Sequence, residues 1–331
     1  MQYADAVKGL FGYYVDGSLI DGTSDPAHVC GPLFQCLCLH SPPSPPVLPS
    51  PPALPSPSMP PPRAPVGSGV QDVHLRFANG GRADFRGRDG ALYCFVSAPS
   101  TVVNVAVANA TFGLHEDATI HGTFLTQAHV VVRARLPDGA PEARGRPRFV
   151  FFNLSFWADR VGPHGYAWDM ITGACGARAL VLGPRGRAAC GDAAARVDYA
   201  TLRVESAGEY EVAVTAQPVY RRVRGPRHRL DVRVTALGDP AAPPPTHGLL
   251  GQGQTGPPRH GAVDVYPRTG TYVTRAWAEG AIDGVPSDYE VPQPHAVDAA
   301  AFAFSRWTTD AAREAATTAA RGAAREAAAR T

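Results

Sequence analysis

Histidines and carboxylates are the residues of this chain that could most directly do chemistry, and their spacing decides which chemistry. His115 and Glu116 begin like the motif of zinc peptidases, whose two histidines stand four residues apart on one helix face. The next histidine is His121, which lies in a predicted strand. The other carboxylates are scattered, and the sequence has no G-x-S-x-G motif, no P-loop and no G-x-G-x-x-G after a strand. We therefore predict no catalytic residue, no metal site and no cofactor.

Arginines form the densest charged cluster of the chain, at residues 221–229. A hairpin turn with solvated arginines explains this cluster without a ligand, and we favour that interpretation. The alternative is binding of an anionic glycan or another polyanion, with surface aromatic residues such as Trp168 or Trp277 contributing. The candidate ligand-binding residues are Arg221, Arg222, Arg224, Arg227 and Arg229.

Six cysteines give the chain an even number of thiols. Cys175 and Cys190 flank a loop rich in glycine and arginine, and a disulfide between them would contribute roughly 3 kcal/mol in the chain-entropy model. Cys94 would then pair with an N-terminal cysteine or stay free in a strand as a small apolar residue. The N-terminal cysteines are Cys30, Cys36 and Cys38, and the last two stand closer together than structural zinc sites require.

Two Asn-x-Ser/Thr sequons, at Asn109 and Asn153, are candidate glycosylation sites. Two sequons are close to the number that chance gives in a chain of 331 residues. They are compatible with export and do not demonstrate it.

Composition divides the chain into four segments. Residues 1–40 form a short cysteine-containing segment. Residues 41–66 are rich in proline and serine, and we predict a polyproline II linker, because proline fixes φ and lacks an amide donor. We interpret the linker as a spacer, with recognition by SH3 or WW domains as the alternative. Residues 67–307 form the main domain. Residues 308–331 favour a helix, which we expect to be an exposed tail or, alternatively, a partner-binding helix.

The main domain alternates short apolar runs with Gly, Pro, Asp and Asn, which is the pattern of strands. Residues 229–236 alternate charged and apolar side chains, so one face of that strand should be wet. Residues 148–157 are almost entirely apolar and should be central. Because no βαβ rhythm is present, we predict a mainly β fold, an antiparallel β-sandwich or stacked sheets. The candidate strands are residues 73–78, 91–97, 102–111, 120–125, 129–136, 148–157, 199–205, 210–216, 229–236 and 271–277.

Charge and hydropathy argue against two kinds of partner. The formal net charge is +2 and the pI is about 8.2, so we predict no nucleic-acid binding. No run approaches the ~20 apolar residues of a membrane span. The apolar run of residues 9–15 is short and ends at Asp16, which makes a poor signal peptide and conflicts with export.

Several short motifs resemble known families. The segments 72–80 (DVHLRFANG), 83–87 (ADFRG) and 93–97 (YCFVS) are similar to the opening of von Willebrand factor type D domains. They are closer still to plant root-cap, late-embryogenesis-related proteins. Residues 301–307 (AFAFSRW) resemble the final strand of that family. Residues 247–252 (HGLLGQ) and 279–292 resemble the C-terminal domain of inter-alpha-trypsin inhibitor heavy chains. The resemblance implies one β-rich domain over about residues 70–307.

The resemblance does not carry over the calcium site of type D domains. Those domains use Asn and Asp beside a G-L-C-G-N segment, where this chain has Leu250 for the cysteine and Gln252 for the asparagine. No carboxylate follows at once, although calcium prefers several hard oxygen ligands. The dense disulfides of animal type D domains are also missing, so we predict no calcium.

These observations predict a non-catalytic, extracellular or wall- or surface-associated structural or interaction module. The resemblance, the even cysteine number and a Ser-Pro composition typical of algal and plant wall proteins support this hypothesis. Its expected partners are polysaccharides or proteins of the wall or surface. The first alternative is a carbohydrate- or polyanion-binding module. The second is a hydrolase of unrecognised type, which would need a pocket with a nucleophile and a base within hydrogen-bond reach.

Overall fold

The computed structural model describes residues 13–15, 18–20, 64–115, 117–137, 149–162, 169–206, 208–237, 245–254, 256–297 and 304–307. The chain divides into two compact units, residues 1–59 and 60–331. In the first unit, β1 (Tyr13–Val15) and β2 (Ser18–Ile20) form an antiparallel pair. The three N-terminal cysteines, residues 41–63 of the predicted linker and the predicted C-terminal helix lie outside the described residues.

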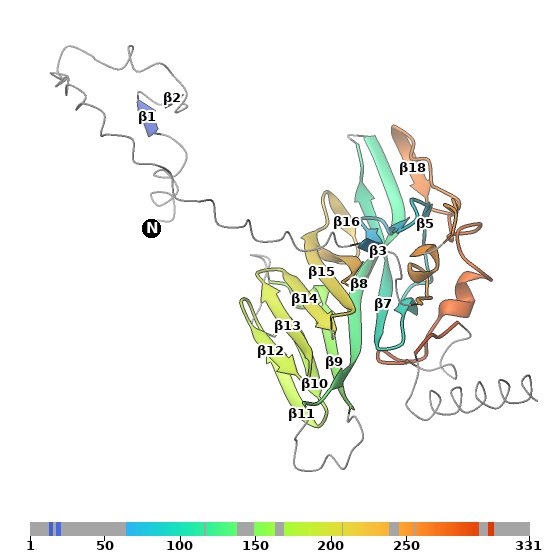
Figure 1. Cartoon of the computed structure of the whole chain (residues 1–331). Helices are drawn as coiled ribbons and strands as arrows, with labels where there is room; N and C mark the ends of the chain where they lie inside the picture. The colour runs from blue at the N-terminus through green and yellow to red at the C-terminus, as the bar shows by residue number, and fades with distance from the viewer. Residues whose placement is uncertain are drawn as a thin grey trace, which may run out of the picture. The chain divides into compact units, whose positions relative to one another are not determined.

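The first sheet of the second unit is organised around its longest strand, β8 (Figure 1). In the described part of the chain its main order is β11-β10-β9-β8-β7-β16, with β6 also paired to β7 and β18 to β8. All pairs are antiparallel except β18 with β8. The predicted central strand, β9, lies inside this order. The strands are β6 (Leu92–Ser97), β7 (Thr101–Gly113), β8 (Asp117–Arg135), β9 (Phe149–Trp157), β10 (Ile171–Cys175), β11 (Arg178–Leu182), β16 (Arg222–Arg224) and β18 (Thr269–Val273).

The second sheet has the order β12-β13-β14-β15-β17-β3-β4-β5 among the described residues, and its ladders are antiparallel. Apolar side chains point inward at every second position of β13, β14 and β17, and polar ones point outward. The wet face predicted for residues 229–236 is therefore confirmed. The strands are β3 (Ala64–Val70), β4 (His74–Phe77), β5 (Arg82–Asp84), β12 (Arg187–Cys190), β13 (Ala193–Asp198), β14 (Thr201–Ser206), β15 (Tyr210–Pro218) and β17 (His228–Ala236).

One apolar core lies between the two sheets and confirms the predicted mainly β, two-sheet fold. Val105 and Leu154 enter it from the first sheet, and Val212 and Val232 enter it from the second. Four aromatic residues of the motifs at residues 72–80, 83–87 and 93–97 are buried in this core, with exposed fractions of 6% or less: Phe77, Phe85, Tyr93 and Phe95. No helix among the described residues is long and apolar enough to cross a membrane.

Residues 245–307 add irregular chain to this frame. The described part of this segment contains the short 3₁₀ helices η3 (Gly251–Gln254) and η4 (Pro286–Tyr289), and a similar helix, η2 (Ala158–Arg160), follows β9. The strand predicted at the end of the domain is wrong in its described part, because residues 304–307 form a turn and coil. This segment is held by the Arg306 amide, which donates to the Ser97 hydroxyl at 2.7 Å, by the Ser305 hydroxyl, which donates to the Val297 carbonyl at 2.6 Å, and by burial of Trp307.

Two boundaries differ from the expected ones, and each lies beside a bulge. Residues 120–125 and 129–136 belong to the single strand β8, since a register shift opposite Ala106 and Val107 absorbs the extra residue, Thr126. The domain begins before residue 67, because β3 starts at Ala64 and Val66 is fully buried. Pro65 is accepted in β3 at a bulge against β17, where a missing amide donor does least harm.

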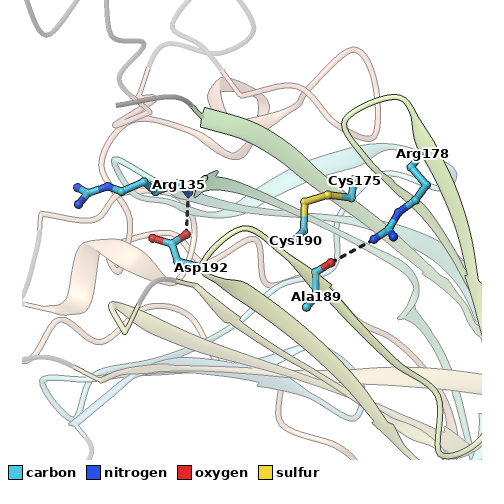
Figure 2. Close-up of a disulfide and its surroundings, with 6 residues drawn as sticks. All are labelled: Arg135, Cys175, Arg178, Ala189, Cys190 and Asp192. Carbon is cyan, nitrogen blue, oxygen red and sulfur yellow. Dashed lines mark hydrogen bonds between the residues drawn. A yellow bond between two sulfur atoms is a disulfide. The ribbon is translucent and has the colours of Figure 1, made fainter. Parts of the chain in front are cut away.

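A disulfide between Cys175 and Cys190 joins the two sheets, because β10 belongs to the first and β12 to the second (Figure 2). The predicted pair is thus bonded, although the residues between form β11 and β12 rather than an irregular loop. Beside it, the Arg135 amide donates to Asp192 Oδ1 at 2.7 Å, which ties the end of β8 to the same corner. Cys94 is free and buried in β6.

Candidate functional site

The arginine cluster lies in the connection from β15 to β17, where the sequence predicts a turn. The structure differs from this prediction, because part of the connection forms the short strand β16. This strand pairs with β7 of the first sheet and not with the second sheet. Two residues with positive φ shape the connection, Arg221 at 47° and Gly225 at 105°. A Cβ at Gly225 would lie 2.8 Å from the Asn109 carbonyl oxygen, so only glycine fits here.

Four of the five candidate arginines are exposed, and the fifth is used by the fold. Arg229 is only half-exposed. Its guanidinium donates to the Pro218 carbonyl at 3.0 Å, forms an ion pair with Asp231 at 3.4 Å and lies over the Phe124 ring. Its cation is therefore directed inward, and it contributes little to a binding surface. The four exposed members, which we call the arginine tract, are Arg221, Arg222, Arg224 and Arg227.

A polar hollow of about 380 Å³ lies beside the arginine tract. Arg86 and Arg224 contribute cations to its wall, and Asn109 and His121 contribute polar groups. The Arg86 guanidinium already donates to the Thr274 carbonyl at 2.6 Å, whereas Arg224 has no ion pair with a described residue. The hollow can therefore accept an anionic group at Arg224. Because Asn109 lines it, a glycan on that asparagine would compete for the same space.

A second polar cluster, which the sequence did not indicate, surrounds Asp72. Its carboxylate accepts hydrogen bonds from the Thr123 amide at 3.0 Å and from the Tyr266 hydroxyl at 2.9 Å. Burial raises the pKa of Asp72 to about 6. Nearby, His74 Nδ1 lies 2.6 Å from Asp84, and this hydrogen bond raises the pKa of the imidazole. The cluster ties β4 and β5 to residues 180 or more positions away, through the His74–Tyr266 ring contact and the Asp264 amide that donates to Asp84, a separation that local pattern cannot reveal.

The nucleophile and base that a hydrolase would need occur together at Ser155. Its Oγ lies 2.8 Å from His129 Nδ1 and 3.1 Å from His295 Nε2. The second nitrogen of His129 faces the Gln127 amide oxygen at 3.2 Å rather than a carboxylate. Ser155 is 5% exposed and His129 is 0% exposed. A substrate could reach this hydroxyl only if the covering chain moved away.

The two sequons lie in different surroundings. Asn109 is exposed on β7, so its amide is accessible to a glycan. Asn153 lies in β9 between β8 and β10, and its side-chain oxygen is buried without a hydrogen-bond partner. The hydroxyl of its sequon, on Ser155, is buried as well. The structure therefore favours Asn109 and disfavours Asn153 as a glycosylated position.

The remaining candidates are dispersed. His115 is exposed after β7 and His121 lies within β8, while Glu116 falls outside the described residues. In the part of the chain that the structure describes, no group of three or more His, Cys, Asp or Glu side chains could hold a metal ion. Trp277 is half-buried against Phe85, with ring centroids 6.3 Å apart, so it offers no free aromatic platform. Trp168 lies outside the described residues.

Comparison with known proteins adds no name to this arrangement. No family model matches the chain. No curated protein matches it either. The function must therefore be inferred from the geometry itself.

Proposed function

We propose that this chain is a non-catalytic interaction module that works outside the cell, at the cell surface or in the wall. The observation that carries the proposal is the Cys175–Cys190 disulfide between the two sheets. Disulfides persist in oxidising compartments and are rare where cellular thiols are kept reduced. A covalent link that a reducing compartment would break fits a protein built for the outside.

The surroundings of Ser155 support the non-catalytic part of the proposal. Its hydroxyl has two imidazoles within reach, but Ser155 and His129 are buried and His295 is half-buried. Burial lowers the pKa of His129 to about 3, which makes this imidazole a weak base. A general base works best with a pKa near the working pH, so the group is better explained as a buried polar tie between β8, β9 and residue 295.

We also propose a relationship to the von Willebrand type D-like and root-cap families. Contacts among the segments that carry the resemblance support it. Segment 247–252 packs along β6, where the Leu249 and Leu250 amides donate to the Cys94 and Phe95 carbonyls at 3.0 and 2.8 Å. Gln252 then accepts from the Asp283 amide at 2.6 Å. Three motifs that are remote in sequence thus meet around one strand.

Non-reducing peptide mapping of the protein from its native source tests the proposed compartment. We expect a peptide pair linked through Cys175 and Cys190, and a glycan on Asn109 but none on Asn153. The physical reason is that Asn109 is exposed whereas the Asn153 oxygen is buried between two strands. A reduced sample of the same preparation serves as the control for the linked pair. Free thiols at both cysteines together with an unmodified Asn109 would refute the extracellular assignment.

A second candidate function, polyanion binding, is favoured by the four exposed cations of the arginine tract. If the arginine tract binds polyanions, free sulfated polysaccharide should bind the purified protein, and the Arg222→Ala/Arg224→Ala variant should bind this polysaccharide about tenfold more weakly. The loss of two cations from an exposed strand explains the effect, and titration at low ionic strength measures it. Unchanged binding by this variant would exclude the arginine tract as the polyanion-binding site.

A further inference from the structure

Arginines form one cross-strand row over the whole width of the second sheet. In an antiparallel sheet, directly opposite residues point to the same face. Six of the eight positions in one such row are arginine, and the other two are small residues. From edge to edge the row is Arg82, Arg76, Ser68, Arg233, Ala213, Arg203, Arg196 and Arg187. No stretch of sequence contains this arginine row, because its members come from eight different strands.

The arginine row lies on the face that points away from the core. The chain neighbours of its members are buried: Leu75 beside Arg76, Val232 beside Arg233 and Leu202 beside Arg203. Five of the six arginines are exposed and Arg203 is half-exposed. Serine and alanine at the remaining positions leave the space above the sheet open. The whole row is therefore accessible to a partner.

Two adjoining hollows follow the arginine row and make it one groove. The first, of about 710 Å³, is lined by Arg76, Ser68, Arg233, Ala213 and Arg203. The second, of about 410 Å³, is lined by Arg203, Arg196 and Arg187. Because Arg203 lines both, the hollows adjoin at this residue, and together they border seven of the eight strands. Neighbouring strands stand about 4.8 Å apart, so the groove is long and runs across the strands.

The charges of the arginine row are only partly neutralised. Arg196 pairs with Asp198 at 3.4 Å, and Arg203 pairs with Glu211 at 3.1 Å. The other four arginines, Arg76, Arg82, Arg187 and Arg233, have no ion pair with any residue that the structure describes. Arg76 stands directly opposite Arg82, as Arg187 does opposite Arg196. Like charges directly opposite one another destabilise a sheet, and a bound polyanion would relieve that repulsion.

We propose that the arginine row binds a linear acidic polysaccharide laid across the strands. Thr215, Gln217 and Thr235 line the same groove and can hydrogen-bond sugar hydroxyls. Glu211 and Asp231 line this hollow as well, but Glu211 is buried and pairs with Arg203. The sugar repeat of an extended pyranose chain is also close to the spacing of neighbouring strands.

Single-stranded nucleic acid fits this groove less well. Proteins that bind it without sequence preference stack successive bases on exposed aromatic rings. The one aromatic residue in the lining of the first hollow is Phe77, which is 6% exposed. The inference rests on the proposed interaction module for its biological setting, but the binding itself can be tested without it.

Titration of the purified, disulfide-bonded full chain with three probes tests the proposal. The probes are heparin as a sulfated polysaccharide, polygalacturonate as a carboxylated one, and single-stranded DNA. The row variant is Arg76→Gln/Arg233→Gln, because both side chains are exposed and lack an ion pair with a described residue. The matched control is Arg135→Gln/Arg275→Gln, which removes the same charge from exposed arginines outside the row. Arg222→Ala/Arg224→Ala reports on the arginine tract.

We expect at least one polysaccharide to bind the wild type more tightly than DNA does. The row variant should bind about tenfold more weakly and the control within about twofold. Which polysaccharide binds distinguishes sulfate from carboxylate as the recognised anion. The row variant should also melt no lower than wild type, because it loses the repulsion between Arg76 and Arg82, and this separates weak binding from misfolding.

Three results would overturn the proposal: no binding of either polysaccharide, tighter binding of DNA, or a row variant that binds like wild type. If only the tract variant loses affinity, polyanion binding survives and the row is excluded. If the arginine row does not bind polysaccharide, the proposed extracellular location is unaffected, because peptide mapping tests that location separately. Conversely, if a protein with free thiols and no glycan binds the polysaccharide, the extracellular assignment is refuted and the binding role of the arginine row stands.

Discussion

As the pH falls from 6.5 to 4.5, the wild-type protein should lose about 2 kcal/mol of stability relative to a His129→Asn variant. His129 is fully buried, and burial lowers its pKa to about 3, with the nearby His295 lowering it further. The unfolded chain takes up a proton near pH 6.5, but the folded chain does not until about pH 3. Acid therefore favours the unfolded state by up to about 1.4 kcal/mol per pH unit in that window.

The contacts of His129 explain why it stays neutral. Its ring nitrogens face Ser155 Oγ at 2.8 Å and Gln127 Oε1 at 3.2 Å, and the Trp157 ring lies edge-on at 5.5 Å. None of these groups carries a negative charge that would stabilise an imidazolium. Urea unfolding of both proteins at several pH values measures the difference in slope, so a constant cost of the substitution cancels. Parallel stability curves for the two proteins would contradict the prediction.

Asp72 provides a control of opposite sign. Burial raises its pKa to about 6, so the folded state holds a proton that the unfolded state releases near pH 3.8. Stability from this group is lost as the pH rises from 3.8 to 6, by about 3 kcal/mol in total. An Asp72→Asn variant should therefore become more stable relative to wild type as the pH increases. The stabilities of the two variants relative to wild type must therefore change with pH in opposite directions.

Removing the inter-sheet disulfide should lower the free energy of unfolding by about 3 kcal/mol, the chain-entropy value for a loop of 15 residues. The bond holds the end of β10 against the end of β12, so its loss frees the corner where the two sheets meet. Denaturant unfolding of wild type and of a Cys175→Ser/Cys190→Ser variant, both without reductant, measures the loss.

The chain's other cysteines make a second comparison necessary. Within the unit of residues 60–331, reductant should destabilise wild type and leave the double-serine variant unchanged, because Cys94, the remaining cysteine of that unit, is already a free thiol. Cys94→Ala serves as a separate control, since it alters a buried thiol without touching the inter-sheet bond. A double-serine variant as stable as oxidised wild type would show that strand pairing alone holds this corner.

The sequence by itself determined the fold class, because alternation of apolar and charged residues is a local property of strands. It also located the arginine cluster and the cysteine pair, since both are close in sequence. It did not predict β3 and it divided β8 into two strands, because bulges let a proline and polar residues continue a strand that a local pattern would end.

Only the tertiary structure decided which side chains meet. The arginine row comes from eight strands between Ser68 and Arg233, and the Asp72 cluster joins residues 194 positions apart. The same pairing buried Asn153, left Asn109 exposed and turned Arg229 inward. Strand order and register set these neighbours, and both depend on long-range hydrogen bonds and core packing that no local stretch of sequence encodes.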